Sequence, residues 1–296
     1  MIRSALFSLI ATLAISAQGP VPMPNGNPTP ASDSGPGVVA AKPGGNLSIM
    51  PTRVVLEGRT RSEEVMLRNS GQAPCTYRIQ FVEMDMDENG QLSERLKKDG
   101  ELTAADLIRF SPRQVELAPG EMQTVRIQVR KPEGLAEGEY RSHLLFQNVP
   151  TAEPPAPVGG EKEVAVKVTT IMGISIPVIL RHGETQGRVR ISELRYEAPK
   201  KADAPPVLSL RMTREGNRSL YGSISAVVES GGQVKKGTLL WGLPAVMIYA
   251  NTPWRNVRIP MFDGIKGDVK GARVKVTFTP VDFKGTPVVS YLDIPA

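Results

Sequence analysis

The sequence EVAVKVTTIMGISIPVIL, from Glu163 to Leu180, decides the fold of this chain. Every even position in it is apolar except Thr170. Successive side chains of a β-strand point to opposite faces, so this alternation predicts one long strand with an apolar face across about 60 Å of extended chain. Soluble proteins usually protect long apolar edge strands against pairing with other chains by charged residues, proline or a covering element. Because most of this strand has no such protection, we expect another protein to cover it.

The first residues have the pattern of a secretory signal peptide. Arg3 supplies positive charge, Ser4–Ile15 form an apolar segment, and Ala14–Ser16 give a small-x-small cleavage site. The apolar segment is too short to span a membrane well. We therefore expect residues 1–17 to be a signal peptide and the mature protein to be exported without a membrane span. Residues 18–45 are rich in proline and glycine, which predicts a disordered leader.

Short alternating runs separated by turn residues begin at Leu47 and predict an all-β fold. We expect an immunoglobulin-like β-sandwich over residues 46–182 and a second β-sandwich over residues 183–296. The expected strands of the first are Leu47–Leu56, Glu64–Asn69, Cys75–Glu83, Leu107–Ser111, Met122–Val129, Ser142–Asn148 and the long run. Those of the second are Val189–Tyr196, Val207–Thr213, Tyr221–Glu229, Thr238–Leu243, Ala245–Tyr249, Asn256–Met261 and Ala272–Thr279. One short helical turn is expected near Ala104–Leu107.

Five motifs stand in order along the first predicted domain. They are TRVVLEG (Thr52–Gly58), LRN (Leu67–Asn69), LAPG (Leu117–Gly120), TVRI (Thr124–Ile127) and EYRSHLLF (Glu139–Phe146). In this order and spacing they resemble the PapD-like periplasmic pilus chaperones of the chaperone–usher pathway. The resemblance covers about Leu47 to Arg181, and the second half of the chain carries no comparably specific motif.

The resemblance implies two immunoglobulin-like domains in a boomerang arrangement, acting in the periplasm. Such a chaperone lends its long strand to a pilin-like subunit that lacks one of its own, then delivers the subunit to an outer-membrane usher. Strand addition supplies main-chain hydrogen bonds, while alternate side chains fill a groove in the subunit. The donated side chains would be Val164, Val166, Val168 and Thr170. We expect the empty chaperone to be monomeric or capped in a dimer of itself.

The resemblance also assigns Arg53 to the position at which the family grips the C-terminal carboxylate of the subunit. Arginine suits this task because it forms bidentate, charge-assisted hydrogen bonds. Ser175 stands where the family has a lysine. Serine donates one neutral hydrogen bond and brings no charge, so the carboxylate would be held more weakly or shared with a cation such as Arg181. This departure indicates a divergent branch of the family.

Other chemistries find little support in the sequence. Asp85–Gly90 matches the first half of a calcium loop, but Leu96 stands where the bidentate glutamate belongs, which favours a polar hairpin turn at Asn89–Gly90. The two histidines have no spaced partners, and Cys75 is expected to be a buried, inert thiol. The net charge of +6 comes from scattered basic residues, and aromatic residues make up only 5%, which argues against nucleic-acid binding. We predict no enzyme activity, no cofactor and no metal.

One alternative function remains open at this point. The three valines could pack only against their own domain, and Arg53 could be an exposed strand arginine. The chain would then be a secreted structural or adhesive two-domain immunoglobulin-like protein, whose long strand pairs with a copy of itself or with a surface polymer. A hydrolase on a β-sandwich is disfavoured because the sequence lacks a recognisable catalytic set.

Overall fold

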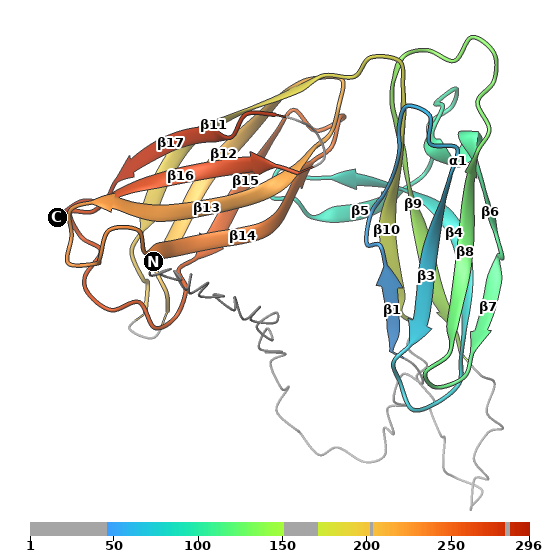
Figure 1. Cartoon of the computed structure of the whole chain (residues 1–296), viewed down its shortest axis with the longest axis horizontal. Helices are drawn as coiled ribbons and strands as arrows, with labels where there is room; N and C mark the ends of the chain where they lie inside the picture. The colour runs from blue at the N-terminus through green and yellow to red at the C-terminus, as the bar shows by residue number, and fades with distance from the viewer. Residues whose placement is uncertain (1–45, 151–170, 202–203, 282–284) are drawn as a thin grey trace, which may run out of the picture. The chain divides into compact units, whose positions relative to one another are not determined.

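The computed structural model describes residues 46–150, 171–201, 204–281 and 285–296 (Figure 1). These residues form two β-sandwiches with separate hydrophobic cores, which confirms the expected all-β, immunoglobulin-like fold class. Both sandwiches belong to one compact unit of the chain. Within the same residues, no helix has the length and apolar character needed to cross a membrane.

The N-terminal sandwich packs a four-stranded sheet against a six-stranded sheet. The strand order is β1-β3-β8-β6 in the first sheet and β2-β10-β9-β4-β5 in the second, where β7 also pairs with β4. The strands are β1 (Leu47–Met50), β2 (Val54–Leu56), β3 (Ser62–Asn69), β4 (Cys75–Met86), β5 (Leu92–Arg95), β6 (Ile108–Ser111), β7 (Gln114–Leu117), β8 (Met122–Val129), β9 (Gly138–Val149) and β10 (Gly173–His182). A helical turn, α1 (Ala104–Leu107), lies where the sequence predicts it.

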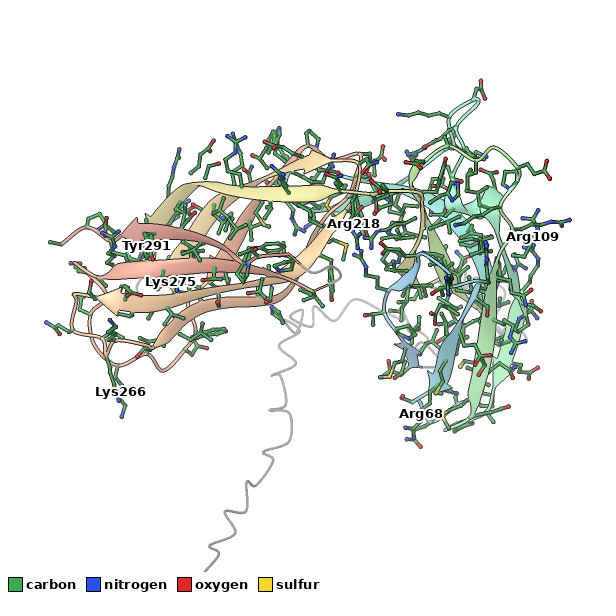
Figure 2. All side chains as sticks on the ribbon, turned by 45° about the horizontal axis from the view of Figure 1, so that its top comes forward. Arg68, Arg109, Arg218, Lys266, Lys275 and Tyr291 are labelled. Atoms are coloured by element: carbon green, nitrogen blue, oxygen red, sulfur yellow. The ribbon has the colours of Figure 1, made fainter. Side chains whose placement is uncertain are left out.

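The C-terminal sandwich packs a three-stranded sheet, β11-β12-β15, against a four-stranded sheet, β14-β13-β16-β17. The strands are β11 (Gly187–Glu197), β12 (Val207–Gly216), β13 (Leu220–Ser230), β14 (Leu239–Ile248), β15 (Trp254–Pro260), β16 (Arg273–Pro280) and β17 (Val288–Asp293). Charged side chains such as Arg68, Arg109, Lys266 and Lys275 project outward from the two sandwiches (Figure 2). Apolar and polar residues alternate along the strands, so the apolar side chains face the core and the polar ones face outward.

Alternation also explains which residues of β9 and β10 form the core. Leu144 and Phe146 of β9 point inward and are fully buried. Ile176 and Val178 of β10 point to the same side, because Ile176 pairs with Leu144 in the antiparallel ladder. The opposite row of side chains, which includes His143 and Ser175, lies on the outer face of this sheet.

Several strands differ from the sequence prediction. Leu47–Leu56 is two strands rather than one, because β1 pairs with β3 in one sheet and β2 pairs with β10 in the other. Thr238–Leu243 and Ala245–Tyr249 are instead one strand, β14, which pairs with β13 through a register shift. The sequence prediction also lacks β5, β7 and β17. Within the predicted long strand, residues 163–170 lie outside the described ranges, Ile171 and Met172 are described but belong to no strand, and β10 begins at Gly173.

The Asp85–Gly90 motif forms the tip of the hairpin between β4 and β5. The side-chain oxygen Oδ1 of Asp87 accepts hydrogen bonds from the backbone N–H groups of Asn89 and Gln91, at 2.9 and 2.8 Å. Gly90 adopts a positive φ of 82°, which glycine tolerates without steric cost. The expected hairpin turn is therefore confirmed.

Candidate functional site

The strand β10 has an open edge over its first half. All of β10 pairs with β9 in an antiparallel ladder, from Gly173 opposite Gln147 to His182 opposite Gly138. On its other side, β2 pairs with β10 only over Val178–Leu180, and the two strands are parallel. Among the residues that the structure describes, no strand pairs with the other edge of Gly173–Pro177. The backbone N–H and C=O groups of that edge can therefore accept another strand.

A row of apolar side chains continues from the core along this open edge. Ile176 is 2% exposed and Val178 is 0% exposed, whereas Ile174 is 43% exposed and Met172 is 54% exposed. These four residues alternate along the chain, so in an extended strand they share one face. The apolar face that fills the sandwich core at one end of β10 is therefore presented to solvent at the other end.

The predicted donor residues Val164, Val166, Val168 and Thr170 lie outside the described residues. Their role stays a prediction. The described residues Met172 and Ile174 extend the same alternating row toward them. Pro177, which lacks a backbone N–H, lies directly before the residue at which pairing with β2 begins.

Arg53 directly precedes β2, whose pairing with β10 begins at Val54. Its side chain is half-buried, and the guanidinium carbon is 4.7 Å from the ring centre of Tyr221 on β13. A cation over the face of an aromatic ring is attracted by the ring's negative face. Arg53 is therefore held beside the junction between β2, β10 and the C-terminal sandwich.

Ser175 lies within the open half of β10, opposite Leu145 of β9. Its hydroxyl donates a hydrogen bond to the thioether sulfur of Met84 at 3.5 Å. This contact is on the outer face of the sheet, the face that also carries His143. A shared carboxylate site for Arg53 and Ser175 stays a prediction from the family resemblance.

A second group of polar residues lies farther along the same outer face. The Arg141 guanidinium carbon is 3.6 Å from the ring centre of Tyr249, and its Nη2 atom donates to the Met84 carbonyl at 2.7 Å. The Nε2 atom of His143 and the hydroxyl of Tyr249 share a hydrogen bond of 3.2 Å. Burial, together with the nearby charge of Arg141, lowers the pKa of His143 to about 3. His143 is therefore neutral at any pH near 7.

Arg181, the last but one residue of β10, is held by two carboxylates. Its Nε atom is 3.0 Å from Glu139 Oε2, and its Nη1 atom is 3.0 Å from Glu57 Oε2. Arg218 of the C-terminal sandwich also binds Glu57, at 2.9 Å, and the backbone N–H of Ser219 donates to Glu139 at 3.0 Å. The Arg181 side chain has no solvent exposure. The suggestion that Arg181 helps to hold a bound carboxylate is therefore wrong.

Sequence reasoning missed this ion cluster, although three of its members stand in the quoted segments. Glu57 directly follows the strand residues of the TRVVLEG motif, Glu139 opens the EYRSHLLF motif, and Arg181 follows the long alternating run. Each is a charged residue at the end of a buried strand, where an ion pair is the usual reason for a charge to be tolerated. That signal marks each residue as a candidate for an ion pair, but it does not show which residues pair with one another.

The N-terminal half of the chain is similar to a known protein family. Residues 46–182 match the family model described as pili and flagellar-assembly chaperone, PapD N-terminal domain. This segment is similar to that family. The resemblance that the five motifs predict is thereby confirmed for the PapD N-terminal domain, while a search of curated proteins found no match.

Three solved structures similar to this chain are described as chaperones or as complexes that contain one. A chain of the CsuC–CsuE chaperone–tip adhesion subunit pre-assembly complex from Acinetobacter baumannii is 12% identical, with a TM-score of 0.43, and the match covers 83% of this chain and 97% of that chain. A chain of the Salmonella enterica complex of SafA pilin with the SafB chaperone is 14% identical, with a TM-score of 0.42, and the match covers 86% of this chain and 99% of that chain. The E. coli chaperone DraB is 14% identical, with a TM-score of 0.39, and the match covers 84% of this chain and 97% of that chain.

Proposed function

We propose that this protein is a periplasmic chaperone that binds incomplete pilin-like subunits by donating the strand that contains β10, and that it delivers them to an outer-membrane usher. The observation that carries the proposal is the open edge of Gly173–Pro177 with the exposed apolar row beside it. The PapD N-terminal domain over residues 46–182 supports it, because that family consists of assembly chaperones for pili and flagella. This role requires no catalytic group and no nucleotide.

Strand addition would use both features of the edge. The unpaired backbone groups would form main-chain hydrogen bonds with a subunit strand, and the exposed row would insert side chains into the subunit core. Full burial of a valine- or isoleucine-sized side chain contributes about 1.5 to 3 kcal/mol. Met172 and Ile174, together with the predicted donors Val164, Val166 and Val168, would supply enough apolar area to offset the cost of association.

Arg53 would fix the register of the bound strand. It lies beside β10 at the point where the open edge ends, so a subunit strand that pairs with Gly173–Pro177 would end near its guanidinium. A terminal carboxylate is the ligand that a guanidinium binds best, through two parallel hydrogen bonds. With serine rather than lysine at position 175, we expect Arg53 to supply most of the charge at this anchor.

The alternative function is a secreted structural or adhesive protein. In that case the open edge of β10 would pair with a second copy of the chain or with a surface polymer, and no subunit would accompany the purified protein. The open edge alone is compatible with either function, because any strand with a fitting apolar face can pair with it. The two functions differ in what occupies the edge in the cell.

The test compares two aspartate variants of the tagged full-length protein expressed in its own host. Ile174→Asp places a charge on the exposed apolar row, whereas Ile171→Asp places the same charge three positions earlier, on the opposite face of an extended strand. Proteins that co-purify from a periplasmic extract are identified by mass spectrometry. We expect a small secreted β-protein with wild type and Ile171→Asp, and its loss with Ile174→Asp. Self-association in all three samples, with no second protein, would favour the structural alternative.

A further inference from the structure

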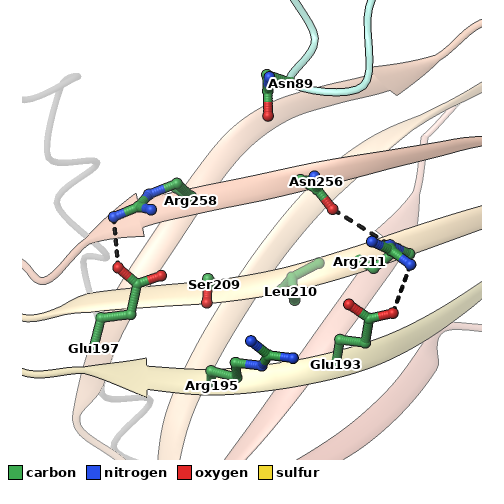
Figure 3. A pocket seen from close by; sticks show the side chains of 9 residues that line it. All are labelled: Asn89, Glu193, Arg195, Glu197, Ser209, Leu210, Arg211, Asn256 and Arg258. Atoms are coloured by element: carbon green, nitrogen blue, oxygen red, sulfur yellow. Dashed lines mark hydrogen bonds and ion pairs between the residues drawn. The ribbon is translucent and has the colours of Figure 1, made fainter.

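A polar groove crosses the outer face of the three-stranded sheet of the C-terminal sandwich. It has a volume of ≈ 290 Å³ and is lined by side chains from β11, β12 and β15, with Asn89 of the β4–β5 hairpin at its rim (Figure 3). Its principal side chains are Arg195, Arg211, Arg258, Glu193, Glu197 and Ser209. None of them belongs to the open edge of β10 or to the Arg181 ion cluster.

A β-bulge in β11 creates the charged side of this groove. Ser192 pairs with Arg211, but the next pair is Arg195 with Ser209, so between these pairs β11 holds one residue more than β12. Ile191 points into the core before the bulge, and Leu194 packs against the same core after it. The bulge therefore turns Glu193 and Arg195 to the outer face. Without it, the period of two would place both charged residues on the side of Ile191.

The backbone at the bulge adopts an unusual conformation. Glu193 has a φ of 52°, and among the described residues it is the one residue other than glycine with a positive φ. A left-handed conformation brings the Cβ atom of an L-residue close to the following carbonyl oxygen and is energetically unfavourable. The surrounding ladder therefore holds Glu193 in place despite this cost, and bulges of this kind commonly re-aim side chains at binding sites.

Two of the three groove arginines are held in place by neighbours. Arg211 is 2.6 Å from Glu193 and lies over the Trp254 ring, with 4.4 Å between the guanidinium carbon and the ring centre. Arg258 is 2.5 Å from Glu197. These contacts restrict the rotamers of both arginines before any ligand arrives. Such restriction lowers the entropy that a ligand must offset on binding.

Arg195 differs from these two arginines. Its side chain is exposed and, within the part of the chain that the structure describes, it forms no hydrogen bond or ion pair. In Figure 3 it lies on β11 between Glu193 and Glu197. Its five N–H donors are therefore available to a ligand that enters the groove.

The whole outer face of this sheet carries an excess of positive charge. Its arginines outnumber its glutamates, five to three: Arg188, Arg190, Arg195, Arg211 and Arg258 against Glu193, Glu197 and Glu215. A surface of this sign favours an acidic partner. The interspersed glutamates would repel the closely spaced charges of a nucleic acid or sulfated polysaccharide, whereas a peptide can place single carboxylates between them.

We propose that this groove binds an acidic peptide segment of a partner protein. A carboxylate of the peptide would accept two hydrogen bonds from Arg195, while Ser209 and the amide of Asn256 would meet its backbone groups. This surface is distinct from the open edge of β10, so the partner bound here can be present together with a protein on that edge. The inference does not depend on strand donation.

The test measures binding of a fluorescein-labelled peptide of alternating glutamate and glycine to the full-length protein by fluorescence polarisation at low ionic strength. A glutamine–glycine peptide is the neutral reference. Arg195→Glu is compared with Arg109→Glu, which makes the same change of net charge at an exposed arginine of β6 (Figure 2). We expect Arg195→Glu to weaken binding by about tenfold or more and Arg109→Glu by no more than about twofold, because only the first removes a charge-assisted hydrogen bond.

Three results would overturn the proposal. The glutamate peptide would bind no better than the glutamine peptide, or both charge reversals would weaken binding equally, or a heparin fragment would displace the peptide and bind more tightly at the same arginine. A thermal melt of each variant shows whether the fold is intact, and Arg195→Gln replaces Arg195→Glu if the reversal disturbs it. Ile174→Asp should bind the peptide as wild type does, which separates this test from that of strand donation.

Discussion

Arg181 and Glu139 form an ion pair of 3.0 Å in which the side chains are 0% and 1% exposed. The pair links the last part of β10 to the first part of β9, where the two strands lie opposite each other in the ladder. Glu57 and Ser219 supply further hydrogen bonds to the two charged groups. This end of β10 is therefore fixed by buried charge, whereas its other end presents an open edge.

Removing one partner of this pair should destabilise the protein strongly. Arg181→Ala leaves the Glu139 carboxylate buried without its cation, a change that typically costs about 3 to 5 kcal/mol. Arg190→Ala is the matched control, because Arg190 pairs with Glu215 on the surface, where such pairs contribute about 1 kcal/mol or less. The midpoint of thermal unfolding measures both. Equal shifts for the two variants would contradict a structural role for the buried pair.

The stability of the protein should fall on mild acidification because of His143. Its pKa is about 3 in the folded chain, owing mainly to burial, and near 6.5 when the chain is unfolded. Between these values only the unfolded chain binds the proton, so stability decreases as pH falls below about 6.5. From pH of about 7.5 to about 5 the loss should be about 2 kcal/mol. His143→Gln, followed by urea unfolding at both pH values, should lose this part of the dependence. An unchanged dependence would refute this assignment.

Glycine should be tolerated better than alanine at position 193. Both Glu193→Gly and Glu193→Ala remove the ion pair with Arg211, so their difference reports the backbone alone. At a φ of 52° glycine avoids the strain that alanine retains, and we expect the glycine variant to be more stable by about 1 kcal/mol. Thermal melts of the two variants measure this difference. A more stable alanine variant would mean that β11 lacks the bulge in solution.

Cys75 should be unreactive in the folded protein. The residue is buried on β4, and burial raises the pKa of its thiol, so little thiolate is present at neutral pH. We expect iodoacetamide to modify Cys75 slowly in buffer and rapidly in denaturant. A Cys75→Ser, Ser70→Cys variant places the thiol at an exposed position and should react rapidly in both. Rapid modification of wild type in buffer would contradict a buried thiol.

The alternation of apolar and polar residues predicts most of the strands, but it does not predict which sheet each strand joins. The bounds of β8, Met122–Val129, are those that the sequence predicts. By contrast, Leu47–Leu56 alternates as one run, and only tertiary structure reveals that β1 and β2 join different sheets. The sequence of β5, LSER, has no apolar period, because pairing with the end of β4 creates this strand. A local pattern carries no information about such pairing.

In the candidate site too, some features can be predicted from the sequence and others depend on the fold. The apolar row that contains Ile174 can be identified from sequence because it repeats every second residue. The cluster around Arg181 cannot, since its partners come from segments far apart in the chain and the direction of each charged side chain depends on the fold. The groove at Arg195 requires the bulge, which a single sequence does not reveal because a bulge changes the period at only one point.

Hydrogen exchange at the edge of β10 tests strand donation most directly. The complex that co-purifies with the wild-type chain is compared with the chain alone, and amide exchange is followed by mass spectrometry over peptides that span residues 163–177. Strand donation predicts strong additional protection of these amides in the complex, with the amides of β11 and β12 unchanged. Exchange at residues 163–177 that is equally fast in both samples would contradict the central claim, because a donated strand must form main-chain hydrogen bonds.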